Sequence, residues 1–97
     1  MIPADAVVVA SDQQLSTTLA GEVIILGLDD SVYYGLSGAG ARIWELLQSP
    51  RTIGEIVQII TAEFDAERDR VAADLDALLA DLESRGLIAI TRSPVDR

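Results

Sequence analysis

Apolar and polar residues alternate in short runs along the first third of the chain, and this pattern predicts β-strands. The apolar run at residues 23–28 is nearly continuous, which is typical of a central, well-covered strand. Residues 32–36 place an apolar side chain at every second position, the pattern of a half-buried strand. Residues 15–20 are rich in Thr and predict a further strand. Residues 7–9 predict a first strand that could take an edge position.

Short polar turns separate the last three of these runs. Gly21 with Glu22 forms one predicted turn, and residues 29–31 form the next. Turns this short join neighbouring antiparallel strands. The pattern therefore predicts a three-stranded antiparallel meander, preceded by a short lead-in at residues 1–6.

The hydrophobic period changes from two to that of a helix after residue 36. Ser37 can cap free backbone N–H groups, and Gly38 and Gly40 allow an open first turn. From Ala41 onward, one helical face is apolar and the other is charged. The apolar positions are Ile43, Trp44 and Leu47. This stretch is predicted to join the sheet to a helical bundle.

Two further helices follow a break at residues 48–51. Thr52 and Glu55 have the spacing of a capping box, and the apolar residues after them recur every three or four positions. Asp65 is the predicted cap of the third helix, and Gly86 is predicted to end that helix in a left-handed conformation. Residues 87–90 predict a short strand or an apolar strap.

A sheet followed by three helices predicts an α+β fold of the winged helix-turn-helix type. In this architecture a three-stranded antiparallel sheet packs on three helices. The length of 97 residues fits one domain, which we place at residues 1–92 with a flexible tail at residues 93–97.

Composition excludes several classes of function. The chain has no Cys and no His, which removes disulfides, thiolate chemistry, the usual zinc sites and histidine-based triads. Its net charge is −9, and all seven basic residues are Arg. A nucleic-acid partner is disfavoured because phosphate contacts require a basic surface. No apolar run is long enough to span a membrane, so we expect no membrane partner and a cytoplasmic location.

Nothing in the sequence predicts catalysis. Asp29 with Asp30, and Asp74 with Asp81, are paired carboxylates, but their positions predict solvated turns or an exposed helical face. The glycines between Gly35 and Gly40 do not have the spacing of a phosphate-binding loop and have no Lys after them. We therefore expect no enzyme activity, no metal site and no cofactor.

A peptide site on the edge of the sheet fits these residues better. If residues 31–36 end the meander, an extended peptide can pair with that edge through backbone hydrogen bonds. Gly35 would allow close approach of a peptide, although a bulge or turn would also explain a glycine there. Tyr34 is predicted to pack in the core and Tyr33 to face outward. Asp74 on the third helix is a candidate partner for a basic peptide residue.

The same stretches resemble the PqqD-like family, also called RiPP recognition elements. The resemblance runs from about Glu22 to Ile88. Its most specific parts are the Tyr-Tyr-Gly-Leu strand, the Ala-Arg-Ile-Trp-Glu-Leu-Leu helix, the Thr-x-x-Glu-Ile helix start and the closing Arg-Gly-Leu-Ile. The resemblance implies a protein that holds the leader segment of a ribosomally made precursor peptide between the third strand and the third helix. It implies these peptide-binding positions: Val32, Tyr33, Tyr34, Gly35, Leu36, Val71, Asp74, Leu75 and Leu78.

Within this family, the sequence looks most similar to the free-standing recognition proteins of lasso-peptide clusters. The resemblance implies delivery of the precursor leader to a separate cysteine protease, with the cyclase as a further candidate partner. The rival is the peptide chaperone of pyrroloquinoline quinone biosynthesis, which presents its precursor to a radical enzyme. The aromatic pair Tyr33-Tyr34 favours the lasso-peptide interpretation. The family shares one fold across many pathways, so this choice rests on analogy.

Overall fold

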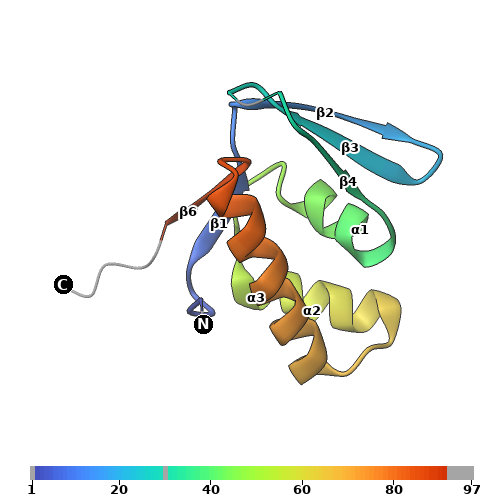
Figure 1. Cartoon of the computed structure of the whole chain (residues 1–97). Coiled ribbons are helices and arrows are strands. Elements are labelled where there is room, and N and C mark those ends of the chain that lie inside the picture. The colour runs from blue at the N-terminus through green and yellow to red at the C-terminus, as the bar shows by residue number, and fades with distance from the viewer. Residues whose placement is uncertain (1, 30, 92–97) are drawn as a thin grey trace.

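A computed structural model describes residues 2–29 and 31–91. These residues form two small antiparallel sheets and three helices (Figure 1). The strands are β1 (Val7–Ala10), β2 (Gln14–Leu19), β3 (Glu22–Gly27), β4 (Tyr33–Leu36), β5 (Arg51–Thr52) and β6 (Ile88–Thr91). The helices are α1 (Gly38–Leu46), α2 (Ile53–Phe64) and α3 (Arg68–Ser84). This arrangement confirms the predicted α+β, winged helix-turn-helix fold.

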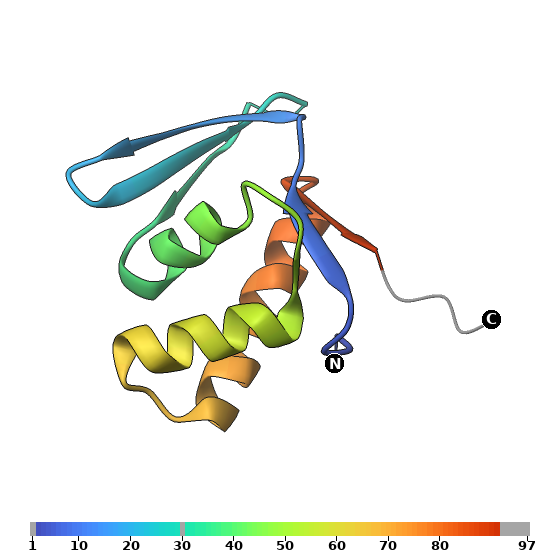
Figure 2. The ribbon, with the colours of Figure 1, turned by 180° about the vertical axis from the view of Figure 1, so that it is seen from behind.

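The predicted meander is the sheet β2-β3-β4, with β3 in its centre. Val23 and Ile25 on β3 are buried toward the helices, whereas Ile24 and Leu26 lie on the other face and are only partly buried. Helix α1 packs under the buried face, and the opposite face points away from all three helices (Figures 1 and 2). One face of this sheet is therefore left uncovered within the described chain.

The second sheet, β5-β1-β6, was not predicted. Strand β1 lies in its centre between β5 and β6, so an edge position for residues 7–9 is wrong. Its partners come from a two-residue strand before α2 and from the strand after α3, and these pairings are long-range contacts that sequence periodicity does not encode. The strand or strap predicted at residues 87–90 is therefore a strand, β6, whose bounds are Ile88–Thr91.

The lead-in before β1 is anchored to the helices. Ala6 is fully buried, and its carbonyl accepts a hydrogen bond from the N–H of Ile53 at 3.0 Å. The N–H of Ile2 donates to the Asp76 carboxylate at 2.8 Å. These contacts attach the N-terminal arm to both α2 and α3.

The helix ends agree with the sequence in part. The capping box is present, because Thr52 accepts from the N–H of Glu55 and the Glu55 carboxylate accepts from the N–H of Thr52. Gly86 has the predicted left-handed conformation, with φ of +73°. Ser37 is the N-cap of α1, but its side chain makes no capping hydrogen bond. Asp65 ends α2 in a left-handed conformation, and Glu67 takes the N-cap of α3, so the predicted role of Asp65 is wrong.

The core is almost entirely aliphatic and lies among β1, β3, the three helices and β6. Its large, fully buried side chains include Ile25, Leu47, Ile56, Leu75 and Leu79. Two parts of the prediction, Asp30 in the turn before β4 and the tail at residues 93–97, lie outside the described residues. Within the described residues, no helix is long and apolar enough to cross a membrane.

Candidate functional site

Strand β4 has an edge that no other described strand covers. It pairs on one side with β3, and β6, the last described strand, pairs with β1 in the other sheet. The N–H of Gly27 donates to the carbonyl of Val32 at 3.1 Å, which fixes the alternation of the antiparallel ladder. From that pair onward, every second residue bonds to β3. The backbone N–H and C=O groups of Tyr33 and Gly35 therefore point toward the open edge.

The side chains of β4 divide between two faces of the sheet. Tyr33 is 71% exposed and lies on the uncovered face. Val32 precedes the strand rather than forming part of it, and it is 45% exposed. Tyr34 and Leu36 face the helices and are partly buried against the core.

Gly35 is not required by the backbone of this fold. It pairs with Ile24 in an unbroken register, so the bulge or turn that could have explained it is absent from this strand. A Cβ at this position would meet only the Cδ1 of Ile24, at 3.9 Å, which is ordinary contact. The glycine leaves the outer side of the open edge without a side chain.

Tyr34 links β4 to the C-terminal end of α3. Its hydroxyl donates to Asp81 Oδ2 at 2.6 Å, and the Arg85 guanidinium lies 5.0 Å from the centre of the Tyr34 ring. Arg85 also donates to Asp81 Oδ1 at 3.2 Å. The hydrogen bond from Tyr34, followed by the one from Arg85, lowers the pKa of Asp81 below its usual value. The same hydrogen bond, together with burial, raises the pKa of Tyr34.

An apolar cavity of about 230 Å³ lies at the other end of β4, among the three helices. Gly40 lines it and lies against Leu36, since a Cβ on Gly40 would come within 3.3 Å of Leu36 Cδ2. All four α3 positions that the family resemblance implies line this cavity: Val71, Asp74, Leu75 and Leu78. The Asp74 side chain is 76% exposed at the rim of this cavity, and its carboxylate lies 3.9 Å from the guanidinium of Arg70, which also lines the cavity.

The nine predicted positions thus fall into three groups. The four α3 residues gather around the cavity, and Leu36 borders it through Gly40. Val32 and Tyr34 line a small recess at the other end of α3, with Arg85 and Leu87. Tyr33 and Gly35 lie on the outer face. The recess and the cavity thus lie at opposite ends of the surface between β4 and α3, and the contact of Tyr34 with Asp81 lies between them.

Sequence reasoning missed part of this surface. Asp81 was predicted to lie on an exposed helical face and Arg85 was not singled out as a site residue, because nothing in a sequence shows that a tyrosine from another element reaches them. Gly40, Phe64 and Ala66 also line the cavity. Their place there depends on how α1 and α2 meet α3, which only the tertiary structure sets.

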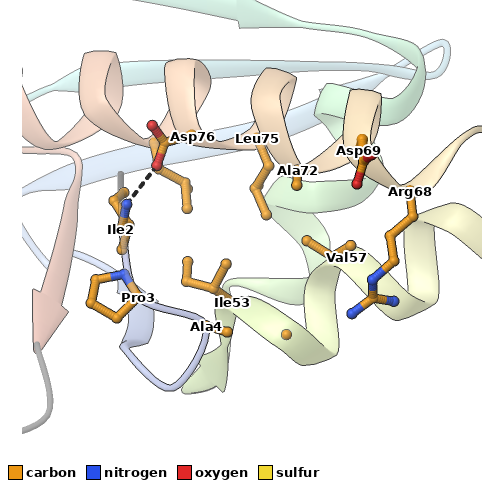
Figure 3. Close-up of a pocket in the computed structure, with 12 residues that line it drawn as sticks. Ile2, Pro3, Ala4, Ile53, Val57, Arg68, Asp69, Ala72, Leu75 and Asp76 are labelled. Carbon is orange, nitrogen blue, oxygen red and sulfur yellow. Dashed lines mark hydrogen bonds between the residues drawn. The ribbon is translucent and has the colours of Figure 1, made fainter.

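A second cavity, of about 260 Å³, lies away from β4 (Figure 3). It is bounded by the N-terminal arm, the start of α2 and α3, and the bond from Ile2 to Asp76 crosses one end of it. Leu75 lines both cavities, so they lie on either side of α3. Within the described residues, no group of three or more acidic side chains could hold a metal ion.

Comparisons with known proteins agree with the resemblance seen in the sequence. The solved structure titled "TbiB1 in Complex with the TbiA(beta) Leader Peptide" superposes with a TM-score of 0.77 and 36% identity, over 82% of this chain and 93% of that one. The PqqA binding protein of Gluconobacter oxydans (strain 621H) is 38% identical over 53 residues, or 55% of each chain. The chain thus spans about half the length of that curated relative. The family described as Coenzyme PQQ synthesis protein D (PqqD) matches residues 22–88, and the chain belongs to this family.

Proposed function

We propose that this chain binds the leader region of a ribosomally synthesised precursor peptide as an added strand on the open edge of β4. The added strand would run along the surface between β4 and α3. By this proposal the chain acts through binding and carries no catalytic group of its own. The peptide would be delivered to a separate cysteine protease in lasso-peptide biosynthesis.

The open edge of β4 beside an apolar cavity is the observation that supports this proposal most. Tyr33 and Gly35 offer outward N–H and C=O groups to a partner strand. Three to five such hydrogen bonds contribute about 1 kcal/mol each, which is too little to offset the entropy lost on association. Apolar anchors are therefore needed as well. Alternate side chains of an added strand point to the same face as Tyr34 and Leu36, where the cavity lies.

The comparisons support the class of ligand. The structure of TbiB1 is a complex with a leader peptide, and it shares fold and 36% identity with this chain. The Gluconobacter relative is described as binding PqqA. That match favours one alternative, in which this chain is a peptide chaperone for a radical enzyme in pyrroloquinoline quinone biosynthesis or in another modified-peptide pathway.

A binding experiment on the labelled protein tests the site. We expect a synthetic leader peptide from this protein's own precursor to shift the backbone amide signals of residues 31–36 and of α3 residues that line the cavity. Shifts confined to other parts of the chain would contradict the site. A short precursor gene found beside this protein's gene would supply the peptide, and its sequence would separate the two pathways.

A pair of matched variants tests whether the Asp74 carboxylate contributes to leader binding. Asp74→Ala is expected to weaken leader binding several-fold if a basic residue of the peptide pairs with it. Asp69→Ala is the control, because Asp69 is also an exposed acid on α3 but borders the other cavity. Equal affinities of the two variants, measured by calorimetry, would remove Asp74 from the site.

Gly35→Ala is a further test of the site. Gly35→Ala adds a methyl group that the fold can accommodate, so we expect the free energy of unfolding to stay nearly the same or to rise slightly. If the peptide backbone packs closely against this residue, leader affinity falls while stability does not. Unchanged affinity would mean that the added strand leaves this side of the edge open.

A further inference from the structure

The other edge of the same sheet is formed by β2, and its exposure is unusual. Every residue from Leu15 to Leu19 is exposed, and the two leucines are 63% and 71% exposed. The strand pairs with β3 over six consecutive positions without a bulge. It contains no charged residue and no proline. Natural edge strands are protected by such devices against pairing with another chain, and β2 has none of them.

We propose that two copies of this chain pair through β2, strand against antiparallel strand, about a two-fold axis at Thr17. The result would be one continuous sheet of six strands. Its two outer edges would be the two β4 strands, so the dimer leaves both β4 edges open. This proposal does not depend on the peptide-binding function.

The hydrogen-bond pattern of β2 determines which residues can bond to a second copy. The N–H of Leu28 donates to the carbonyl of Gln13 at 3.1 Å, and bonded pairs alternate along β2 from that point. Leu15, Thr17 and Leu19 therefore bond to β3. The backbone groups of Ser16 and Thr18 point to the open edge.

This pattern favours one register, in which the side chains of β2 are complementary to those of β2 in the second copy. When Ser16 bonds to Thr18 of the second copy, Thr17 lies opposite its own equivalent on the axis. Leu15 then lies opposite Leu19 of the second copy, in a non-hydrogen-bonded pair, where side chains approach most closely. Moving the register by two residues would place each of these leucines opposite a less apolar residue or beyond the strand.

The lack of charge on β2 favours a second copy of this chain as the partner, rather than a protein with a basic surface. The chain carries a net charge of −9, so most of its surface repels another copy. The uncharged β2 is a place where two acidic chains can meet without placing like charges directly opposite each other. A basic partner, in contrast, would find no carboxylate on this strand. Because the remaining charges still repel, the dimer should form more readily as salt is added.

The contact is small. One strand pair and four leucine side chains fall short of the roughly 1,200–2,000 Å² buried in stable complexes. We therefore expect a reversible dimer with a dissociation constant on the order of 0.1–1 mM, rather than a permanent one.

Sedimentation equilibrium on the full chain from low to millimolar concentration tests the dimer. We expect the mean mass to rise toward that of two chains and to rise further in 0.5 M NaCl. Leu19→Lys is expected to weaken the dimer at least tenfold. Leu28→Lys is the control, because Leu28 is an exposed leucine at the end of β3 and lies outside β2. A monomer at every concentration, or an equal effect of both variants, would overturn the proposal.

A crosslinking pair tests the register. The chain has no cysteine, so one introduced thiol reports one position. In the proposed register Thr17→Cys places two Cα atoms about 4.5 Å apart across the axis, which suits a disulfide. Thr18→Cys places its two equivalents beyond about 7 Å, which does not. We expect fast oxidation to a covalent dimer for Thr17→Cys alone, and equal rates for the two variants would overturn the register. Circular dichroism checks that each variant is folded.

Discussion

Tyr34 contributes both to the core and to the contact between β4 and α3. Its ring lies on the helix-facing side of β4 and packs against the core, as the alternation of residues 32–36 predicted. Its hydroxyl reaches α3 and donates to Asp81 at 2.6 Å. A partly buried ring whose hydroxyl donates to a carboxylate holds the edge strand at a fixed distance from the helix. That spacing is what an added strand would have to fit.

The carboxylate of Asp81 makes stability depend on pH. Its folded-state pKa is depressed below the ordinary 3.8, so its stabilising contribution is present above about pH 4 and is lost as the pH falls through the folded value. Asp81→Asn keeps an acceptor for Tyr34 but removes the charge. We expect its unfolding free energy to fall below that of the parent protein above pH 5, and the difference to shrink below pH 3. A difference that is constant from pH 2 to pH 7 in urea unfolding would contradict this.

The turn between β2 and β3 contains a strained residue. Ala20 and Gly21 both have positive φ, of 54° and 81°, as a two-residue hairpin turn requires. Alanine adopts this conformation at a cost of about 1 kcal/mol, which asparagine reduces. Ala20→Asn is expected to raise the unfolding free energy by about 0.5–1 kcal/mol. Gly21→Ala, which introduces the same strain next to it, should lower it. Chemical denaturation of both variants provides the measurement.

At the scale of elements, the junction of β5 and α2 connects the second sheet, β5-β1-β6, to the helices. Thr52 pairs with Val7 in the second sheet and caps α2 at the same time. Helix α2 is further tied to α1 by Arg42, whose guanidinium contacts both oxygens of Glu63 at 2.8 and 2.9 Å. Because one residue ends a strand and starts a helix, the register of the second sheet also sets where α2 begins.

The cap at Thr52 makes a measurable contribution. Thr52→Ala removes the side-chain acceptor for the N–H of Glu55 and is expected to cost about 1 kcal/mol of stability. Thr52→Ser keeps a hydroxyl in the same place and should retain most of that stability. Thermal unfolding of the two variants measures the difference. If both lose the same amount, the methyl group of the threonine, rather than the cap, supports this junction.

At the scale of the whole molecule, charge is the dominant surface property. The chain has sixteen acidic residues and seven arginines. The ion pairs among the described residues are few and solvent-exposed. Exposed pairs contribute little, so the net repulsion of a chain at −9 should outweigh them. An acidic surface also speeds encounters with basic partners, which suits a protein proposed to capture a peptide.

Salt should therefore stabilise the folded chain. Raising NaCl from 0.01 to 0.3 M shortens the screening length from about 30 Å to under about 10 Å. We expect the unfolding free energy to rise by up to about 1 kcal/mol, because repulsion among acids at longer range is screened. Repeating the urea titration in KCl controls for a specific effect of sodium. A decrease with salt would mean that the pairs of Arg42 dominate instead.

The sequence by itself determined the local structure and the family of this protein. A Thr-rich stretch located β2, a nearly continuous apolar run located β3, and alternation located β4. The three-and-four spacing located α2 and α3, and the Thr52 and Glu55 pair located a helix start, because each signal lies within a few neighbouring residues. Tertiary structure alone decided the rest. It placed β1 between β5 and β6, brought Tyr34 to Asp81 across 47 positions, and gathered the cavity from three helices. Such contacts depend on how whole elements pack against each other, and periodicity along a chain does not specify that packing.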